Sequence, residues 1–324
     1  IAFASIAGTA SAQCVGDSYL DGLTDAQQTA LATTIADMPF SEGLIWSATK
    51  GEDTLTIVGT MHIYDPRLDA IAARVADQVA NADLLLVEAT DADEAALQTL
   101  ITQEPDRLFI TDGPTLPDLL DEDMWAMLSE AATDRGIPGF MAAQMQPWYL
   151  SLLLAIPTCA MADLTAGQPG LDKMIMEQAD AAGVPIASVE PFTTLFEIFG
   201  DQPVDEQLDT LRVSLMEPDL QQEMFVAMLD RYFAEDIGQL WEMSRLAVGD
   251  IADLDPDEGA AMFAEMEDGL LVQRNRNWIP VILDATESHD DVVIAVGAAH
   301  LIDDDGILQL LQNEGWTLTR QTSP

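Results

Sequence analysis

Short apolar runs, separated by polar or turn-forming residues, alternate along the chain with longer segments of helical periodicity. Three runs rich in Val, Ile and Leu, at residues 54–59, 83–88 and 292–296, have the length and composition of buried parallel strands. Between the first two, apolar residues recur three or four positions apart over residues 66–82, which predicts an amphipathic helix. The order strand, helix, strand predicts an α/β fold.

The remaining pattern predicts a mixed sheet with many helices. Residues 43–48 should pair with residues 54–59 across a turn at residues 50–53, and further strands are expected at residues 184–189 and 316–318. A capping box at Thr24 and Gln27 predicts a helix that continues to about residue 36. Further helices are expected at residues 116–135, 147–156, 171–182, 204–248, 258–286 and 305–313. We therefore expect one α/β domain, residues 14–324, with a central mixed sheet and a large helical insertion at about residues 91–285.

Two of the predicted strands end in the same local pattern, Gly-x-x-His. One is Gly59-Thr60-Met61-His62 and the other is Gly297-Ala298-Ala299-His300, in a chain with three histidines. The carboxyl ends of parallel strands form the edge of a sheet where ligands bind. Histidine is a common metal ligand and proton carrier. We expect the two histidines to lie close together in one site.

Glu88 is a third candidate for this site. It directly follows the apolar run Leu84-Leu85-Leu86-Val87, where a carboxylate is costly to bury unless it is paired or bound to a metal. A right-handed β-α-β crossover would bring Glu88 to the same sheet edge as His62. Two histidines and one carboxylate form a common catalytic metal site with one position open for water, so we predict His62, Glu88 and His300 as metal ligands. The alternatives are structural histidines and an exposed carboxylate.

Glu190, Arg274 and Asn275 are further candidate catalytic residues. Glu190 follows the apolar residues 186–189 and could act as a general base or a further ligand, or be an exposed residue. Arg274 and Asn275 stand out because the chain has 12 Lys and Arg residues. A guanidinium could clamp a carboxylate or stabilise an oxyanion, or form a salt bridge on a helix surface. We expect Arg274 and Asn275 to orient the substrate, whereas His289, among acidic residues, is expected to be solvated.

The charge of the chain restricts its partners. Asp and Glu number 57 and Lys and Arg number 12, which gives a formal net charge of −45. Such a surface disfavours binding to nucleic acids and to anionic lipids, because both require a basic surface. No apolar run reaches the length of about 18 residues that a transmembrane helix needs, so we expect no membrane span in the mature chain.

The start of the chain indicates export. Residues 1–13 are mostly small and apolar and contain Ala10-Ser11-Ala12, as at the end of a secretory signal peptide, so we expect a signal-peptide remnant here. This predicts a periplasmic or secreted protein. An exported chain with two cysteines commonly forms a disulfide, so we expect a bond between Cys14 and Cys159; two unrelated thiols are the alternative.

Several short motifs, in order along the chain, resemble those of the TraB/GumN family, which includes the Tiki metalloproteases. They extend from about residue 43 to the end of the chain. The matching motifs are Gly59-Thr60-Met61-His62, Asp65-Pro66-Arg67, residues 83–88, Gln146-Pro147-Trp148, Gly170-Leu171-Asp172, Val189-Glu190, Arg274-Asn275, Gly297-Ala298-Ala299-His300, Gly306 and Gly315-Trp316. One departure follows Glu190, where residues 191–199 are mostly apolar and the family has a polar stretch with a Gln.

This resemblance implies both a fold and an activity. The fold would have two pseudo-symmetric halves, each with a strand ending in Gly-x-x-His, as in the wider erythromycin-esterase-like and ChaN-like group. The activity would be hydrolysis of peptides with a divalent metal, manganese or cobalt rather than zinc, held by His62, Glu88 and His300. We therefore expect an exported metal-dependent hydrolase, a peptidase, acting on a peptide or small-molecule substrate. The alternative is a non-catalytic protein that sequesters a peptide, haem or other small ligand in the same cleft.

Overall fold

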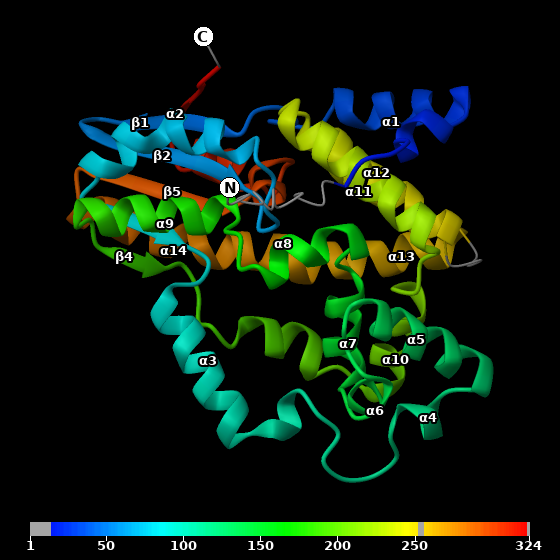
Figure 1. Ribbon diagram of the computed structural model, residues 1–324. Coiled ribbons are helices and arrows are strands. Elements are labelled where there is room, and N and C mark those ends of the chain that lie inside the picture. The colour runs from blue at the N-terminus through cyan, green and yellow to red at the C-terminus, as the bar shows by residue number, and fades with distance from the viewer. Residues whose placement is uncertain (1–13, 252–255, 323–324) are drawn as a thin grey trace, which may run out of the picture.

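A mixed six-stranded sheet forms the centre of the protein, in the strand order β4-β3-β5-β2-β1-β6. The computed structural model describes residues 14–251 and 256–322 (Figure 1), so the expected signal-peptide remnant lies outside the described residues. The strands are β1 (Ile45–Lys50), β2 (Asp53–Thr60), β3 (Leu84–Val87), β4 (Ile186–Ser188), β5 (Asp291–Gly297) and β6 (Thr317–Arg320). Strands β4, β3, β5 and β2 are parallel, while β1 pairs antiparallel with both β2 and β6. The predicted α/β class with a mixed sheet is confirmed.

The two strands that end in Gly-x-x-His, β2 and β5, are direct neighbours in the sheet. Their register pairs Ile57 with Ile294 and Thr60 with Gly297, so they end almost side by side. Strand β5 is inserted between β2 and β3, although β3 is the next parallel strand along the chain. Because all four parallel strands run in the same direction, the residues that follow them meet at one edge of the sheet.

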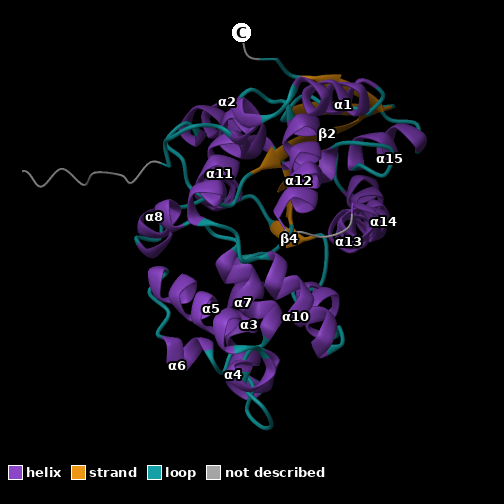
Figure 2. Ribbon diagram, turned by 90° about the vertical axis from the view of Figure 1, so that its right-hand side faces the viewer, coloured by secondary structure: helices purple, strands orange, loops and turns teal. Residues whose placement is uncertain are grey.

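Helices cover both faces of the sheet. They include α2 (Leu68–Asn81), α9 (Leu171–Ala182), α14 (Gln273–Ser288) and α15 (Ile307–Asn313). Figure 2 shows the sheet between α2 and α11 (Pro218–Phe233) on one side and α14 and α15 on the other. The periodic residues Leu68, Ile71, Val75 and Val79 of α2 are all buried, as their spacing predicts.

The region between β3 and β5 is mainly helical. Its other helices are α3 (Asp91–Gln103), α4 (Leu116–Leu119), α5 (Glu122–Asp134), α6 (Gly139–Ala142), α7 (Pro147–Leu154), α8 (Met161–Thr165), α10 (Val204–Val213), α11 (Pro218–Phe233), α12 (Ile237–Ile251) and α13 (Pro256–Glu267), with π-helical turns η4 (Phe196–Gly200) and η5 (Asp268–Val272). Helices α3–α7 and α10 form a lobe below β4 (Figure 1), and a separate apolar cluster that includes Leu116, Leu128, Leu150 and Leu211 stabilises it. No described helix is long and apolar enough to cross a membrane by itself. The helical segments Pro147–Leu154 and Thr158–Thr165 together have the length and apolar composition of a membrane span, but they are bent by 76° relative to each other.

Two of the predicted helices are shorter than expected. The predicted helix at residues 204–248 is wrong as one element, because it is divided into α10, α11 and α12. Pro218 begins α11 at the first helical position, where a missing N–H costs no hydrogen bond, and Glu235, with a φ of 59°, separates α11 from α12. The predicted helix at residues 116–135 is likewise divided into α4 and α5. The capping box at Thr24 and Gln27 is present and begins α1 (Asp25–Ala36).

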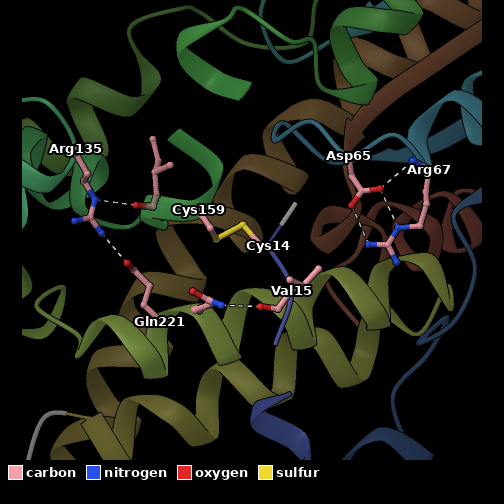
Figure 3. Close-up of a disulfide and its surroundings, with 9 residues drawn as sticks. Cys14, Val15, Asp65, Arg67, Arg135, Cys159 and Gln221 are labelled. Carbon is pink, nitrogen blue, oxygen red and sulfur yellow. Dashed lines mark hydrogen bonds and ion pairs between the residues drawn. A yellow bond between two sulfur atoms is a disulfide. The ribbon is translucent and has the colours of Figure 1, made fainter. Parts of the chain in front are cut away.

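The predicted disulfide between Cys14 and Cys159 is confirmed (Figure 3), with 5.3 Å between the two Cα atoms. It connects the first described residue to the turn η3 (Thr158–Ala160) before α8. Gln222 of α11 donates a hydrogen bond to the carbonyl oxygen of Val15, at 2.7 Å. The two contacts together fix the start of the described chain against two distant helical segments.

Removing this disulfide should destabilise the fold. In the chain-entropy description, a bond across 145 residues lowers the entropy of the unfolded chain, so replacing both cysteines by Ser should lower the free energy of unfolding by up to about 5 kcal/mol. Urea unfolding of the oxidised wild type and the double variant measures the difference. Reduced wild-type protein is the control and should match the double variant; a double variant as stable as the oxidised protein would contradict the prediction.

Candidate functional site

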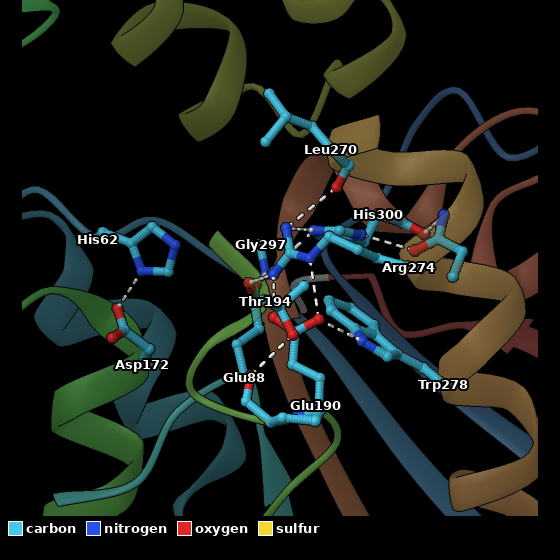
Figure 4. A network of polar contacts seen from close by, with 12 residues as sticks. His62, Glu88, Asp172, Glu190, Thr194, Leu270, Arg274, Trp278, Gly297 and His300 are labelled. Carbon is cyan, nitrogen blue, oxygen red and sulfur yellow. Dashed lines mark hydrogen bonds and ion pairs between the residues drawn. The ribbon is translucent and has the colours of Figure 1, made fainter. Parts of the chain in front are cut away.

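Five polar residues predicted from the sequence meet at the carboxyl edge of the parallel strands. Four of them are labelled in Figure 4, and the fifth, Asn275, contacts His300. Glu88 directly follows β3, and Glu190 follows β4 by two residues. Arg274 and Asn275 lie in the first turn of α14, which begins directly after the π-helical turn η5. His300 lies in the short helix η6 (Ala298–Leu301), which begins directly after β5. Contacts between these residues therefore join segments that are far apart in the sequence.

Arg274 is the centre of the network. Its Nη2 donates to Glu88 Oε2 and Glu190 Oε1, both at 2.6 Å, and its Nε donates to Glu190 Oε2 at 3.1 Å. Its Nη1 donates to the carbonyl oxygen of Leu270 at 3.0 Å and lies 3.2 Å from His300 Nε2. A guanidinium has five N–H groups, so every donor of Arg274 is used inside the protein. None remains to bind a substrate in this arrangement.

Glu190 fixes the position of Arg274. Besides its two bonds to the guanidinium, Glu190 Oε2 accepts a hydrogen bond from Trp278 Nε1 at 2.9 Å. The Trp278 ring centroid lies 4.8 Å from Arg274 Cζ and 4.3 Å from the His300 ring centroid. Both carboxylate oxygens of Glu190 are thus engaged, which favours a positioning role over the roles of general base or ligand.

Glu88 is ionised at neutral pH. Burial by itself would raise its pKa, but three positive charges outweigh burial and lower the pKa to about 2: those of His300, which is protonated at the acid pH where Glu88 titrates, of His62 and of Arg274. The backbone N–H of Gly297 also contributes by donating to Glu88 Oε1 at 2.7 Å. Each oxygen of Glu88 accepts one hydrogen bond within the described residues, which leaves one lone pair on each oxygen.

His300 is neutral and has a defined tautomer. Burial lowers its pKa to about 4. Its Nδ1 lies 2.6 Å from Asn275 Oδ1, while Asn275 Nδ2 donates to the carbonyl oxygen of Asp305 at 2.9 Å. These contacts assign the amide oxygen of Asn275 as the acceptor, so the proton of His300 is on Nδ1 and the lone pair is on Nε2.

His62 lies apart from this network, beside Asp172 (Figure 4). Its Nδ1 forms an ion pair with Asp172 Oδ1 at 3.2 Å, and its side chain is 63% exposed. This contact with Asp172 raises the pKa of His62 to about 9, so its imidazole is protonated at neutral pH. Asp172 is the second residue of α9, a helix that Gly170 brings close to the His62 backbone.

The structure thus assembles the predicted site in two parts. One bonded network contains Glu88, Glu190, Arg274, Asn275 and His300. In the part of the chain that the structure describes, no hydrogen bond or ion pair joins His62 to this network. His62 still affects the network electrostatically, because its charge contributes to the low pKa of Glu88. Within the described residues, no three His, Cys, Asp or Glu side chains are grouped so that they could hold a metal ion. The three predicted ligands therefore share one edge of the sheet without forming an assembled coordination shell.

Two residues of the site had no role assigned from the sequence. Trp278 lies within a helical pattern, and its bond to Glu190 depends on a contact between residues 88 positions apart. Asp172 belongs to the motif Gly170-Leu171-Asp172, which was the available signal for this residue. A glycine at the start of a helix permits another backbone segment to approach closely, and an acidic residue in the first turn suits the helix dipole.

A profile of the TraB/PrgY/gumN family matches residues 44–320, which includes β1 to β6 and every residue of the network. The chain belongs to the TraB/PrgY/gumN family. The predicted family resemblance is therefore confirmed. No curated protein matches the chain.

The segment after Glu190, which departs from the TraB/GumN pattern, has a structural explanation. Its Phe196 is buried, and the ring of Phe199 stacks on that of Trp148 at a centroid distance of 6.4 Å. The apolar residues 191–199 therefore connect the site to the aromatic cluster of the helical lobe.

Replacing Gly170 by Ala should displace His62. A Cβ atom at residue 170 would lie 2.4 Å from the carbonyl oxygen of His62, closer than real Cβ atoms come, so α9 or the His62 backbone has to move. The ion pair with Asp172 should weaken, and the pKa of His62 should fall from about 9 towards its ordinary value of 6.5. NMR titration of the imidazole signals measures this change. Gly22→Ala is the control, because a Cβ there meets nothing within 4 Å; an unchanged His62 pKa in Gly170→Ala would refute the prediction.

Asp172→Asn should lower the pKa of His62 and change how stability depends on pH. Because the folded pKa of about 9 lies above the ordinary value of 6.5, the ion pair stabilises the fold fully below pH 6.5 and is lost as the pH rises through 9. The effect should be about 1 kcal/mol or less, because His62 is exposed. Unfolding free energies of metal-free wild type and variant should therefore converge between pH 6.5 and 9. A constant difference over this range would show that the ion pair does not contribute.

Proposed function

We propose that this protein is an exported metal-dependent hydrolase that cleaves peptide bonds, with manganese or cobalt as its metal. One observation carries the proposal: two imidazoles, each held at Nδ1 by an oxygen atom, share a sheet edge with the ionised carboxylate of Glu88. Membership of the TraB/PrgY/gumN family supports it.

The donor atoms fit a divalent metal in their chemistry. Metal-ligating histidines commonly bind an oxygen acceptor through the second ring nitrogen, which fixes the ring and its tautomer. Asn275 does this for His300, and Asp172 would do it for His62, whose Nε2 would have to lose its proton before it could bind an ion. Glu88 would be the third ligand, because each of its oxygens retains a lone pair. Imidazole and carboxylate are suitable ligands for manganese and cobalt.

The residues of the site would have different roles in the hydrolysis. A bound ion would supply a water molecule of lowered pKa and would polarise the substrate carbonyl. Glu88, which is ionised and has a free lone pair on each oxygen, would bind the ion and accept a hydrogen bond from the attacking water. Glu190 holds Arg274 close to the reacting group. The positive charge of Arg274, in a site shielded from water, would stabilise the oxyanion that develops on the substrate.

Export and a peptide substrate are parts of the same proposal. A disulfide is typical of oxidising compartments, which favours a periplasmic or secreted location. The peptide substrate rests on the resemblance to the Tiki branch of the family. A net charge of −45 disfavours nucleic acids as substrates.

Cleavage of a peptide library by the purified protein tests the proposal. Protein stripped of metal with a chelator should be inactive, and addition of Mn²⁺ or Co²⁺ should produce defined cleavage products in mass spectrometry. Glu88→Gln keeps the shape of the side chain and removes its charge, so the rate should fall by about 10²–10⁴-fold. His289→Gln is the matched control, since His289 contacts the carbonyl oxygen of Ala285 and lies outside the site; its activity should equal that of the wild type.

The alternative function gives a different result in the same experiment. A protein that only sequesters a peptide or haem would retain that ligand tightly and release no products with either metal. Glu88→Gln as active as the wild type would exclude Glu88 from the reaction and contradict the proposed mechanism.

A further inference from the structure

We propose that Arg274 is an exchangeable occupant of the metal position: its guanidinium binds His300 and Glu88 in the metal-free protein and must release His300 before an ion can bind there. This inference rests on the proposed function, because it assumes that His300 is a metal ligand. It assigns Arg274 two successive positions in one site.

The lone pair of His300 is the first reason. Nδ1 of His300 carries the proton that Asn275 Oδ1 accepts, so Nε2 is the only ring atom with a lone pair. An imidazole nitrogen has a single lone pair in the plane of the ring, and Nη1 of Arg274, at 3.2 Å, donates to it. A metal ion bound to Nε2 would need the same lone pair. The two contacts therefore exclude each other.

Charge is the second reason. Arg274 Nη2 lies 2.6 Å from Glu88 Oε2, and the Arg274 side chain is 9% exposed, so little water screens its charge. A divalent ion bound to the same carboxylate and imidazole would lie next to this guanidinium, where the repulsion between cations is strong at low dielectric. Release of Arg274 from Glu88 and His300 removes both conflicts.

Glu190 provides a second position for Arg274. The bonds from Nε and Nη2 to the two oxygens of Glu190 do not involve Glu88 or His300, so they can persist after the exchange. Two N–H groups, one on Nη1 and one on Nη2, would then be unpaired and available to a substrate carbonyl. Arg274 would thus orient substrate only when the ion is bound, which reconciles its expected role with the absence of an available donor in this structure.

Binding of Co²⁺ alone to metal-free protein tests this exchange. Arg274→Met keeps most of the side-chain volume and removes the competing donor, so calorimetric titration should give a Kd about tenfold or more below that of the wild type. Arg276→Met is the matched control: it removes the same charge two residues further along α14, from a side chain that is 59% exposed and paired with Asp305. Its Kd for Co²⁺ should lie within about twofold of the wild-type value, since screening weakens exposed charges.

The outcomes separate this inference from the proposed function. If wild type binds Co²⁺ and Arg274→Met binds it equally or more weakly, Arg274 supports the ion and the inference is wrong, while the metal site stands. If neither protein binds Co²⁺, the proposed metal site fails and the inference fails with it.

Circular dichroism would show whether Arg274→Met is folded. If it is not, a measurement on the wild type still tests the inference. Addition of Zn²⁺, a diamagnetic ion, should shift the NMR signals of the Arg274 guanidinium N–H groups, because their acceptors change. Binding of Zn²⁺ with unchanged Arg274 signals would overturn the inference.

Discussion

The buried guanidinium of Arg274 allows two carboxylates to approach each other at the edge of the sheet. The side chains of Glu88, Glu190 and Arg274 are 17%, 10% and 9% exposed, so all three charges are largely removed from water. Two ionised carboxylates in such a place would repel each other and lose hydration, and only a cation that bonds to both compensates for these costs. Removing one partner of such a cluster costs about 3–5 kcal/mol, because the other charges remain buried without compensation. The edge of the sheet therefore depends on Arg274.

Glycines bring the backbones close enough for this cluster to form. A Cβ atom on Gly59 would lie 3.0 Å from the Cα atom of Ala298, so this glycine allows η6 to pack directly on β2. A Cβ atom on Gly297 would lie 3.3 Å from Glu88 Oε1, the atom to which the Gly297 N–H donates. The Gly-x-x-His pattern thus has a structural explanation. The glycine permits a neighbouring segment to pack closely against the strand, and the histidine follows at the edge of the sheet.

The sequence predicted the strand ends well and their connections only partly. Glu88 and His300 were located correctly at strand ends, because a continuous apolar run followed by a polar residue is a local signal. The insertion of β5 between β2 and β3 is a pairing of distant segments, and no local pattern encodes it. The helix α3 was not predicted: Leu97, Leu100 and Ile101 give it a short apolar stripe that packs on the aromatic cluster of the helical lobe, but no residue of α3 is fully buried. Burial of Arg274 between Glu88 and Glu190 likewise depends on the distant strands β3 and β4; the sequence indicated that this guanidinium could clamp a carboxylate but not which one.

The two histidines show how one sequence pattern gives two different charge states. Both His62 and His300 follow a glycine by three positions at the ends of neighbouring parallel strands. The Nδ1 partner of His62 is the carboxylate of Asp172, and this contact raises the pKa to about 9. The Nδ1 partner of His300 is the neutral amide of Asn275, and burial lowers the pKa to about 4. The motif therefore determines where an imidazole is placed, while the helix that packs beside it, α9 or α14, determines whether that imidazole is a cation or a neutral base.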